Sequence, residues 1–201
     1  MSRFVFLFDL DSTITRQEIL PTLAKDIGKY DEMRTLTEKT MIGEVPFKQS
    51  FLKRVNLLKD VPVSKIQKII ENIQLNEEIV SFIQNNKSRC YVVSGNLDVW
   101  IEPLMKKIGI EKNVFCSKAI TNEADKLVDV LSVVDKNSVI NQMVLPFVAI
   151  GDGNNDAEMI YAAEVGIGYG GVRDIAPSVL ECATHAVYDE HTLCRLLNKL
   201  V

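Results

Sequence analysis

Residues 4–13 read FVFLFDLDST, five apolar residues followed at once by a segment with Asp9 and Asp11. A short run without polar positions is typical of a strand that is buried on both faces of a sheet. Open α/β sheets place their chemistry at the carboxyl ends of such strands. A buried charge is costly unless it is paired, bound to a metal or used in a reaction. The two carboxylates therefore predict a functional site at the end of the first strand.

Short apolar runs of the same kind recur along the chain, with helical patterns between most of them. These runs lie at 90–93, 114–116, 146–150 and 165–167. Alternating strands and helices predict a Rossmann-like α/β fold, a doubly wound parallel sheet with helices on both faces. A weakly alternating stretch, 118–135, predicts a small hairpin or an extended crossing.

The long interval between the first two strands breaks this alternation, because it contains helical patterns and no strand pattern. The helical patterns cover residues 17–27, 30–41, 46–59 and 64–73. Proline near two of the expected helix starts fits, because the N–H that proline lacks is not used in the first turn of a helix. We therefore predict a small all-helical cap, residues 15–74, inserted into a catalytic core formed by residues 1–14 and 75–201.

The composition restricts the class of partner. The chain has 201 residues, an apolar content of 47% and a formal net charge of -4, so it can bury a substantial core but has no strongly basic surface. We therefore expect a small-molecule partner, and neither nucleic acid nor a membrane. The first apolar run is too short for a signal peptide or a spanning helix, which predicts a cytosolic protein. No feature of the sequence indicates an oligomeric state.

Further motifs place polar groups at the ends of later strands. GDGNND at 151–156 brings a second pair of acids, SGN at 94–96 brings a hydroxyl and backbone N–H groups, and Lys136 brings a positive charge. Carboxylates from two strand ends suit Mg²⁺, which takes one or two protein carboxylates and substrate phosphate. Alone, each motif also fits a turn, a helix cap or a solvated lysine. Their combination predicts a phosphate and metal site.

The ordered motifs DLDSTIT, VVSGN, Lys136 and GDGNND resemble the four motifs of the haloacid dehalogenase superfamily of phosphohydrolases. The helical insertion between the first two motifs resembles the small cap of one class in that superfamily. Within it, Glu18 and the cap stretch 38–60 resemble the phosphoserine phosphatases. The resemblance implies an Mg²⁺-dependent phosphomonoester hydrolase that forms a phosphoaspartate, with O-phosphoserine as the substrate of the branch that it resembles most.

The resemblance also implies a role for each residue of the site. Asp9 is then the nucleophile and Asp11 the acid and base, which requires surroundings that separate their pKa values. The implied metal ligands are Asp9, the main-chain oxygen of Asp11 and Asp152, supported by Asp156. The implied phosphate-binding residues are Ser94, Gly95, Lys136 and Asn155. The implied substrate pocket consists of Glu18, Met41, Phe47 and Arg54.

The residues alone do not decide the roles of the two charged members of this pocket. Arg54 lies at the edge of an apolar helical stripe, where it requires an anionic partner, extends past the stripe to solvent or pairs with a cap glutamate. Glu18 forms a T-x-x-E capping box with Thr15, which alone explains a glutamate there. The resemblance implies instead that Arg54 binds a substrate carboxylate and that Glu18 binds a substrate ammonium.

The chain departs from the family pattern near the phosphate motif. Asn96 stands where the family commonly has a second glycine, and the segments on both sides of Lys136 are shorter than usual. One alternative is therefore a small-cap phosphatase for another metabolite. A second is a non-enzymatic phosphoacceptor, because receiver domains also combine strand-end acids, a hydroxyl, a lysine and Mg²⁺. Receivers, however, lack a helical lid and an acid equivalent to Asp11.

Overall fold

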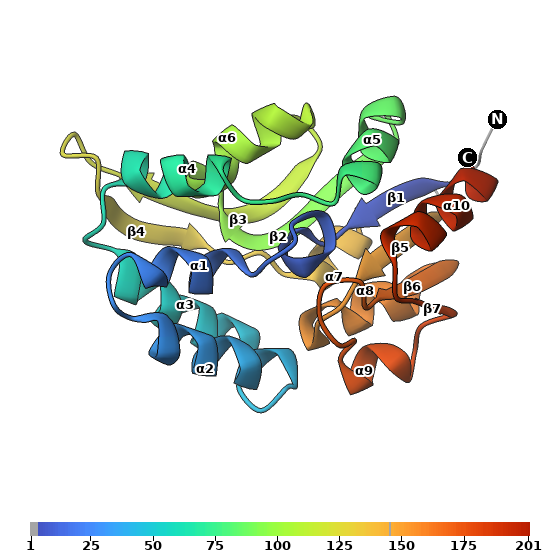
Figure 1. The fold of residues 1–201 in the computed structure, drawn as a ribbon, viewed down its shortest axis with the longest axis horizontal. Coiled ribbons are helices and arrows are strands. Elements are labelled where there is room, and N and C mark those ends of the chain that lie inside the picture. The colour runs from blue at the N-terminus through green and yellow to red at the C-terminus, as the bar shows by residue number, and fades with distance from the viewer. Residues whose placement is uncertain (1–3, 145) are drawn as a thin grey trace.

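A seven-stranded sheet organises the computed structural model, which describes residues 4–144 and 146–201 (Figure 1). The strands are β1 (Val5–Phe8), β2 (Cys90–Leu97), β3 (Val114–Thr121), β4 (Leu127–Ser132), β5 (Phe147–Gly151), β6 (Val165–Tyr169) and β7 (His185–Val187). Their order is β4-β3-β2-β1-β5-β6-β7, and neighbours are parallel except for the antiparallel pair β3 and β4. The predicted α/β fold with a mostly parallel sheet is confirmed.

β1 lies at the centre of the sheet because its side chains are apolar on both faces. Phe6 and Phe8 pack in one core layer, where their ring centroids lie 5.1 and 6.2 Å from that of Phe82. Val5 and Leu7 pack in the opposite layer. All four side chains of the strand are buried. Cover on both faces explains why this stretch is continuously apolar rather than alternating.

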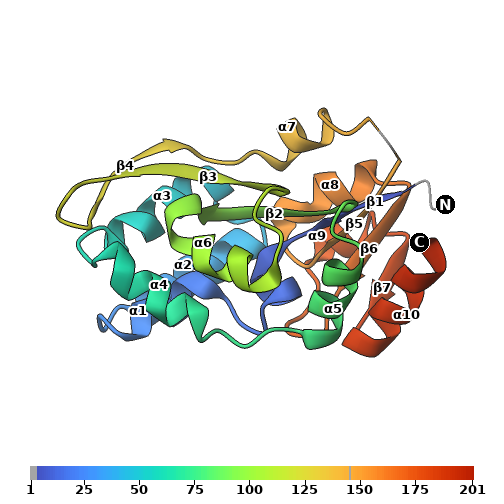
Figure 2. The same ribbon diagram turned by 90° about the horizontal axis from the view of Figure 1, so that it is seen from above.

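Helices cover the two faces of the sheet as separate layers (Figure 2). The layer that packs on Phe6 and Phe8 contains α5 (Glu77–Asn85), α6 (Asp98–Ile108) and α10 (Glu190–Leu200). The opposite layer contains α7 (Lys136–Ile140), α8 (Ala157–Ala162) and α9 (Pro177–Leu180). Within the described residues, no helix is both long enough and apolar enough to cross a membrane.

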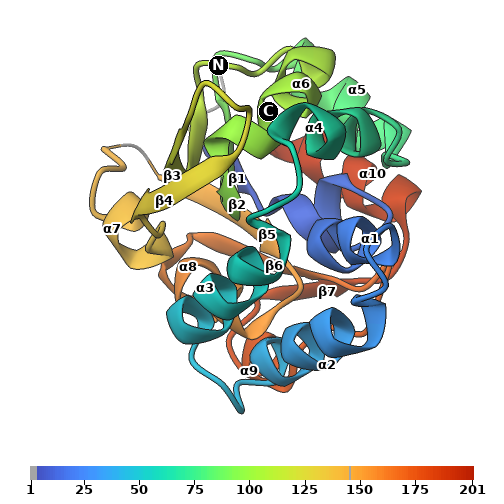
Figure 3. The same ribbon diagram turned by 90° about the vertical axis from the view of Figure 1, so that its left-hand side faces the viewer.

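The segment after β1 places helices beyond the carboxyl end of that strand (Figures 1 and 3). The chain passes through a tight turn, η1 (Leu10–Ile14), into α1 (Ile19–Lys25), α2 (Tyr30–Met41), α3 (Phe47–Leu58) and α4 (Val63–Glu71). This confirms the helical insertion expected after the first strand. α4 also touches the core layer, because Gln67 Nε2 donates to the carbonyl of Val99 at 2.7 Å. The helices α1 to α3 therefore cover the end of the sheet where the motifs converge.

The prediction of a capping box between Thr15 and Glu18 at the start of α1 is wrong. The helix begins at Ile19, and the side chain of the preceding residue, Glu18, makes no capping hydrogen bond. Thr15 Oγ1 accepts instead from the Ser12 N–H at 3.2 Å, inside the turn η1. The Ile19 N–H donates to Asp11 Oδ1 at 2.8 Å. One of the two acids after β1 therefore fixes the first turn of the cap.

The stretch 118–135 forms a hairpin, which is one of the two structures expected for it. β4 follows β3 through a turn that contains Asp125, with φ +60°. At this turn the carboxylate of Asp125 accepts the Ser64 N–H at 3.0 Å and its carbonyl accepts the Val63 N–H at 2.8 Å. The hairpin turn thus satisfies N–H groups at the start of α4 that have no partner inside the helix. The short edge strand β7 had no signal in the sequence.

We expect Gly109→Ala to destabilise the fold by about 1 kcal/mol. Gly109 ends α6 with φ +77°, and its N–H donates to the carbonyl of Met105 at 2.8 Å. A side chain is strained in this left-handed conformation. Urea unfolding of both proteins measures the difference. The cost should persist in a Lys87→Ala background, which removes the nearest side chain; equal unfolding midpoints for Gly109→Ala and wild type would contradict the backbone explanation.

Candidate active site

The carboxyl ends of three neighbouring strands bring the predicted polar groups together. Asp9 follows β1, Asp152 follows β5, and Ser94 lies in the second half of β2. Lys136 starts α7, and Asp156 ends the single turn η2 (Asn154–Asp156). All of these side chains are buried. The strand-end rule therefore located the cluster, although its members are far apart in the sequence.

The cluster contains more negative than positive charge. Carboxylate oxygens of Asp9, Asp152 and Asp156 all lie within 4.8 Å of one another. Lys136 Nζ is 2.6 Å from Asp9 Oδ1 and also contacts Asp156 Oδ1. Burial lowers the pKa of Lys136, but Asp156 and Asp9 outweigh it and raise that pKa above its ordinary value. The lysine therefore stays charged and neutralises part of the cluster.

Burial and the excess negative charge raise the pKa values of Asp9 and Asp152. Burial, followed by the carboxylate of Asp156, raises the pKa of Asp9 well above its usual range. Burial, followed by the carboxylate of Asp9, does the same to the pKa of Asp152. A further cation would offset the like charge that contributes to both pKa shifts.

The residues present fit a divalent metal ion. Both carboxylate oxygens of Asp152 are buried and have no hydrogen-bond partner among the described residues. Asp156 differs, because its Oδ2 accepts the N–H groups of Asp152 and Gly153 at 3.2 and 3.0 Å. Asp152 Oδ2 lies at ion-pair distance from Arg173 Nε, 3.3 Å, but neither oxygen accepts a hydrogen bond, and such hard oxygens suit a divalent cation. Asp9 and Asp152 can therefore supply metal ligands, while Asp156 orients the backbone beside them.

Asp11 lies next to this cluster but has different partners. Its Oδ1 accepts the Ile19 N–H at 2.8 Å, and its Oδ2 accepts from Asn96 Nδ2 at 2.5 Å. Burial, followed by the carboxylate of Glu18, raises the pKa of Asp11 to about 7. A carboxyl group with such a pKa can both donate and accept a proton near neutral pH. The arrangement is thus suited to acid and base chemistry at Asp11.

A cavity of about 30 Å³ separates the acids from the cap helices. Of the residues expected at the site, its walls contain Asp9, Asp11, Glu18, Met41, Phe47, Arg54, Gly95 and Asn155. The other expected residues are Ser94, Lys136, Asp152 and Asp156, which are buried outside these walls. A cavity of this size holds little more than a water molecule. The cap is therefore closed over the acids in this structure.

Phe47 of α3 closes the cavity against the phosphate motif. A Cβ atom on Gly95 would overlap the Phe47 ring, so this close approach requires glycine. The ring stacks on Phe51 with a centroid distance of 5.6 Å and an interplanar angle of 10°. Contact between the cap and the β2 end is therefore direct and apolar at this point.

Arg54 is buried in the cavity wall without a direct ion pair. Its side chain is 5% exposed, its Nη1 donates to Thr37 Oγ1 at 3.2 Å, and its buried Nε has no hydrogen-bond partner among the described residues. No described carboxylate forms a direct ion pair with its guanidinium. Burial lowers the pKa of Arg54, while the carboxylates of Glu18 and Asp11 act to raise it. Its burial excludes an arginine that extends to solvent, and Glu18 pairs with Arg173 instead. A buried guanidinium without a direct ion pair favours an anionic partner in the cavity.

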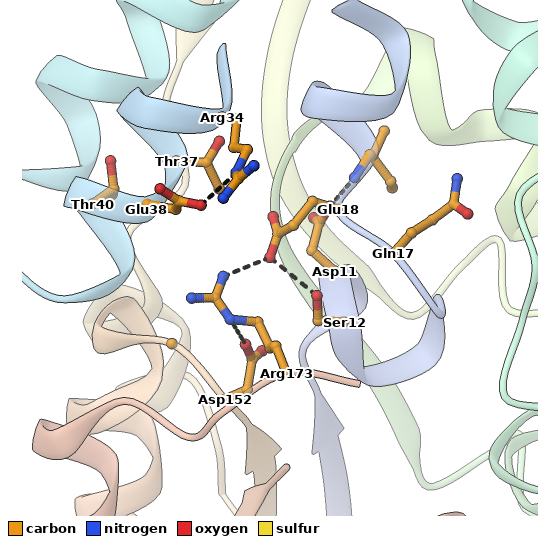
Figure 4. Close-up of polar contacts among 12 residues, drawn as sticks. Asp11, Ser12, Gln17, Glu18, Arg34, Thr37, Glu38, Thr40, Asp152 and Arg173 are labelled. Carbon is orange, nitrogen blue, oxygen red and sulfur yellow. Dashed lines mark hydrogen bonds and ion pairs between the residues drawn. The ribbon is translucent and has the colours of Figure 1, made fainter. Parts of the chain in front are cut away.

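Glu18 has partners that the sequence did not indicate, as Figure 4 shows. Its Oε1 accepts from Ser12 Oγ at 3.1 Å and lies 3.0 Å from Arg173 Nη1. Arg173 Nε lies 3.3 Å from Asp152 Oδ2. Sequence reasoning missed Arg173, which follows a glycine-rich stretch, residues 166–171, outside the four motifs. Its position just after the carboxyl end of β6 was the available signal.

We expect metal-free protein to lose stability as the pH rises from about 4 to about 7. Between the ordinary pKa of 3.8 and the folded value of about 7, Asp11 holds a proton only in the folded state, so raising the pH destabilises that state. Asp11→Asn should therefore differ least from wild type at about pH 4 and exceed its melting temperature at pH 8. Thermal melts in EDTA measure this. Parallel pH profiles of the two proteins would contradict it.

Comparison with known proteins places this geometry in a family. Phosphoserine phosphatase of Methanocaldococcus jannaschii is 31% identical over 82% of this chain and 84% of that protein. The enzyme of that name from Archaeoglobus fulgidus is 32% identical over 82% of this chain, which spans only 52% of that protein. A solved phospho-aspartyl intermediate analogue of phosphoserine phosphatase matches with a TM-score of 0.82 at 27% identity and covers both chains completely. Residues 6–160 match the haloacid dehalogenase-like hydrolase model, and the chain belongs to that family.

Proposed function

We propose that this hydrolase is an Mg²⁺-dependent phosphoserine phosphatase, which converts O-phosphoserine and water into serine and phosphate. The observation that carries the proposal is the buried guanidinium of Arg54, which makes no direct ion pair and shares a cavity with Asp9. A carboxylate is the planar anion that a guanidinium binds best. The names of the relatives, phosphoserine phosphatases at about 30% identity, support the same substrate.

In the proposed reaction, the two acids after β1 divide the chemistry. A carboxylate oxygen of Asp9 attacks phosphorus and the bond to the serine oxygen breaks, while Asp11 gives its proton to that oxygen. Water then attacks the phosphoaspartate and gives a proton to Asp11, which releases phosphate and restores Asp9. The pKa of about 7 at Asp11 supports this exchange.

Positive groups around the transferred phosphoryl group would stabilise its charge. Asp9 and Asp152 would hold Mg²⁺, which neutralises the phosphate and keeps Asp9 ionised. Lys136, Ser94 and backbone N–H groups at Gly95 would bind phosphoryl oxygens. The contact of Lys136 Nζ with Asp9 Oδ1 at 2.6 Å supports this role. Asn155, in the cavity wall, would contribute its amide.

Substrate entry requires movement of the cap. The closed cavity of about 30 Å³ is far smaller than an amino-acid phosphate. Phe47 and Met41 form its apolar side, and Arg54 would receive the substrate carboxylate. Glu18 would bind the substrate ammonium while it keeps its ion pair with Arg173. Closure then excludes water from the reaction, as lids commonly do.

We expect Arg54→Ala to lower kcat/KM for phosphoserine roughly 10- to 100-fold, the range for losing hydrogen bonds between charged groups. The loss should be small for phosphoethanolamine, which has no carboxylate. Phosphate release from both esters with Mg²⁺ measures this. Lys53→Ala, an exposed cation on the same helix, is the matched control.

Asp9→Asn in the same assay should abolish turnover while the protein remains folded. Wild-type activity on phosphoserine no higher than on a panel of other monoesters would reject phosphoserine as the substrate. A single burst of phosphate transfer without turnover would favour a phosphoacceptor instead.

Mg²⁺ should stabilise the wild-type protein by about 2.7 kcal/mol at a free concentration 100 times its Kd. Asp152→Asn should lose this effect, because it removes the carboxylate whose oxygens lack hydrogen-bond partners. Thermal melts with MgCl₂ and with EDTA measure it. Asp129→Asn, at an exposed position on β4, should retain the response. An equal Mg²⁺ response of Asp152→Asn and wild type would place the metal elsewhere.

A further inference from the structure

Asn96 is the polar residue that the chain has where its family commonly has glycine, and the structure gives its amide two different environments. Its Nδ2 donates to Asp11 Oδ2 at 2.5 Å and to Ser94 Oγ at 3.2 Å. Its Oδ1 is buried and has no hydrogen-bond partner among the described residues. The residue is 3% exposed and forms part of the cavity wall.

The orientation of this amide follows from the chemistry of its neighbours. The NH₂ group of Asn96 has two hydrogens and two neighbouring acceptors, Asp11 Oδ2 and Ser94 Oγ, which together fix this orientation. Oδ1 is then turned away from Asp11. A buried carbonyl oxygen without a partner costs free energy, which indicates that a donor arrives with a ligand.

The cavity has another acceptor, Glu18, but it is already engaged. Its Oε1 accepts from Ser12 Oγ at 3.1 Å and pairs with Arg173 at 3.0 Å. Arg173 therefore neutralises much of the charge with which Glu18 would attract an ammonium. Asn96 Oδ1 is buried in the same wall with no such competitor.

The position of Oδ1 relative to Asp11 suits one kind of substrate group. Asp11 must reach the ester oxygen of the leaving group to protonate it, and Asn96 is hydrogen-bonded directly to Asp11. In serine, the ammonium is on the carbon next to the one that bears this oxygen. An ammonium on that carbon is therefore close to the ester oxygen that Asp11 protonates. Asn96 Oδ1 is likewise close to Asp11, because Nδ2 of the same amide is hydrogen-bonded to it.

We propose that Asn96 is a specificity-determining residue, which fixes Asp11 through Nδ2 and accepts a hydrogen bond from an ammonium of the leaving group through Oδ1. This inference rests on the proposed phosphatase function and extends it to the substrate class, phosphomonoesters with an amino group next to the ester carbon. A glycine at this position would offer neither contact.

Two esters separate the roles of the amide. Phosphoserine has the ammonium, whereas the phosphate ester of 3-hydroxypropionate lacks it and keeps the carboxylate. We expect Asn96→Ala to reduce the preference for phosphoserine, expressed as the ratio of the two kcat/KM values, at least about 10-fold. Asn96→Asp keeps an acceptor but loses the donor to Asp11. It should keep the preference and lower kcat on both esters.

An equal loss on both esters in Asn96→Ala, or no loss, would overturn the inference, because Asn96 would then act only on Asp11 or not at all. Wild-type protein that prefers phosphoserine, together with an unchanged preference in Asn96→Ala, rejects this inference alone. Wild-type protein that does not hydrolyse phosphoserine rejects the proposed function and this inference with it. Melting temperatures establish that the variants fold, and Asn96→Gly replaces Asn96→Ala in the comparison if the latter does not.

Discussion

Burial of like charges at the end of an apolar strand is the constraint on which this molecule depends. β1 needs apolar side chains on both faces to lie at the centre of the sheet, and its carboxyl end then delivers Asp9 into a region without bulk water. Asp152 and Asp156 arrive from β5 and the turn after it. Lys136 balances only part of this charge. The remaining demand for a cation makes the site suitable for a metal and a phosphoryl group.

The same end of the sheet couples the cap to the chemistry. Asp11 accepts the first N–H of α1, so the start of the cap and the proposed acid and base share one side chain. Phe47 of α3 rests on Gly95, and Arg173 joins Glu18 to Asp152. Movement of the cap therefore acts directly on groups of the site. Apolar contact favours closure, while the ion pairs of Arg173 couple the proposed substrate-binding residue Glu18 to the proposed metal ligand Asp152.

Local signals in the sequence were sufficient where local physics decides the structure. The apolar run of β1 and the periodicity of α2 predicted those elements, and strand-end acids predicted where the site lies. The T-x-x-E pattern at Thr15 failed because the turn η1, with Ser12 at φ +57°, engages that threonine first. β7 was not predicted because its three residues form a mostly exposed edge strand without an apolar run.

By itself, the sequence determined the fold class and the chemical types at the site, because strand burial and motif order are local properties of the chain. Only the tertiary structure decided which of these side chains contact one another. It paired Arg173 with Glu18, left Arg54 without a direct ion pair and directed the NH₂ group of Asn96 to Asp11. These contacts join side chains separated by up to 155 positions. Their partners depend on how cap, strand ends and loops pack, which no local pattern records.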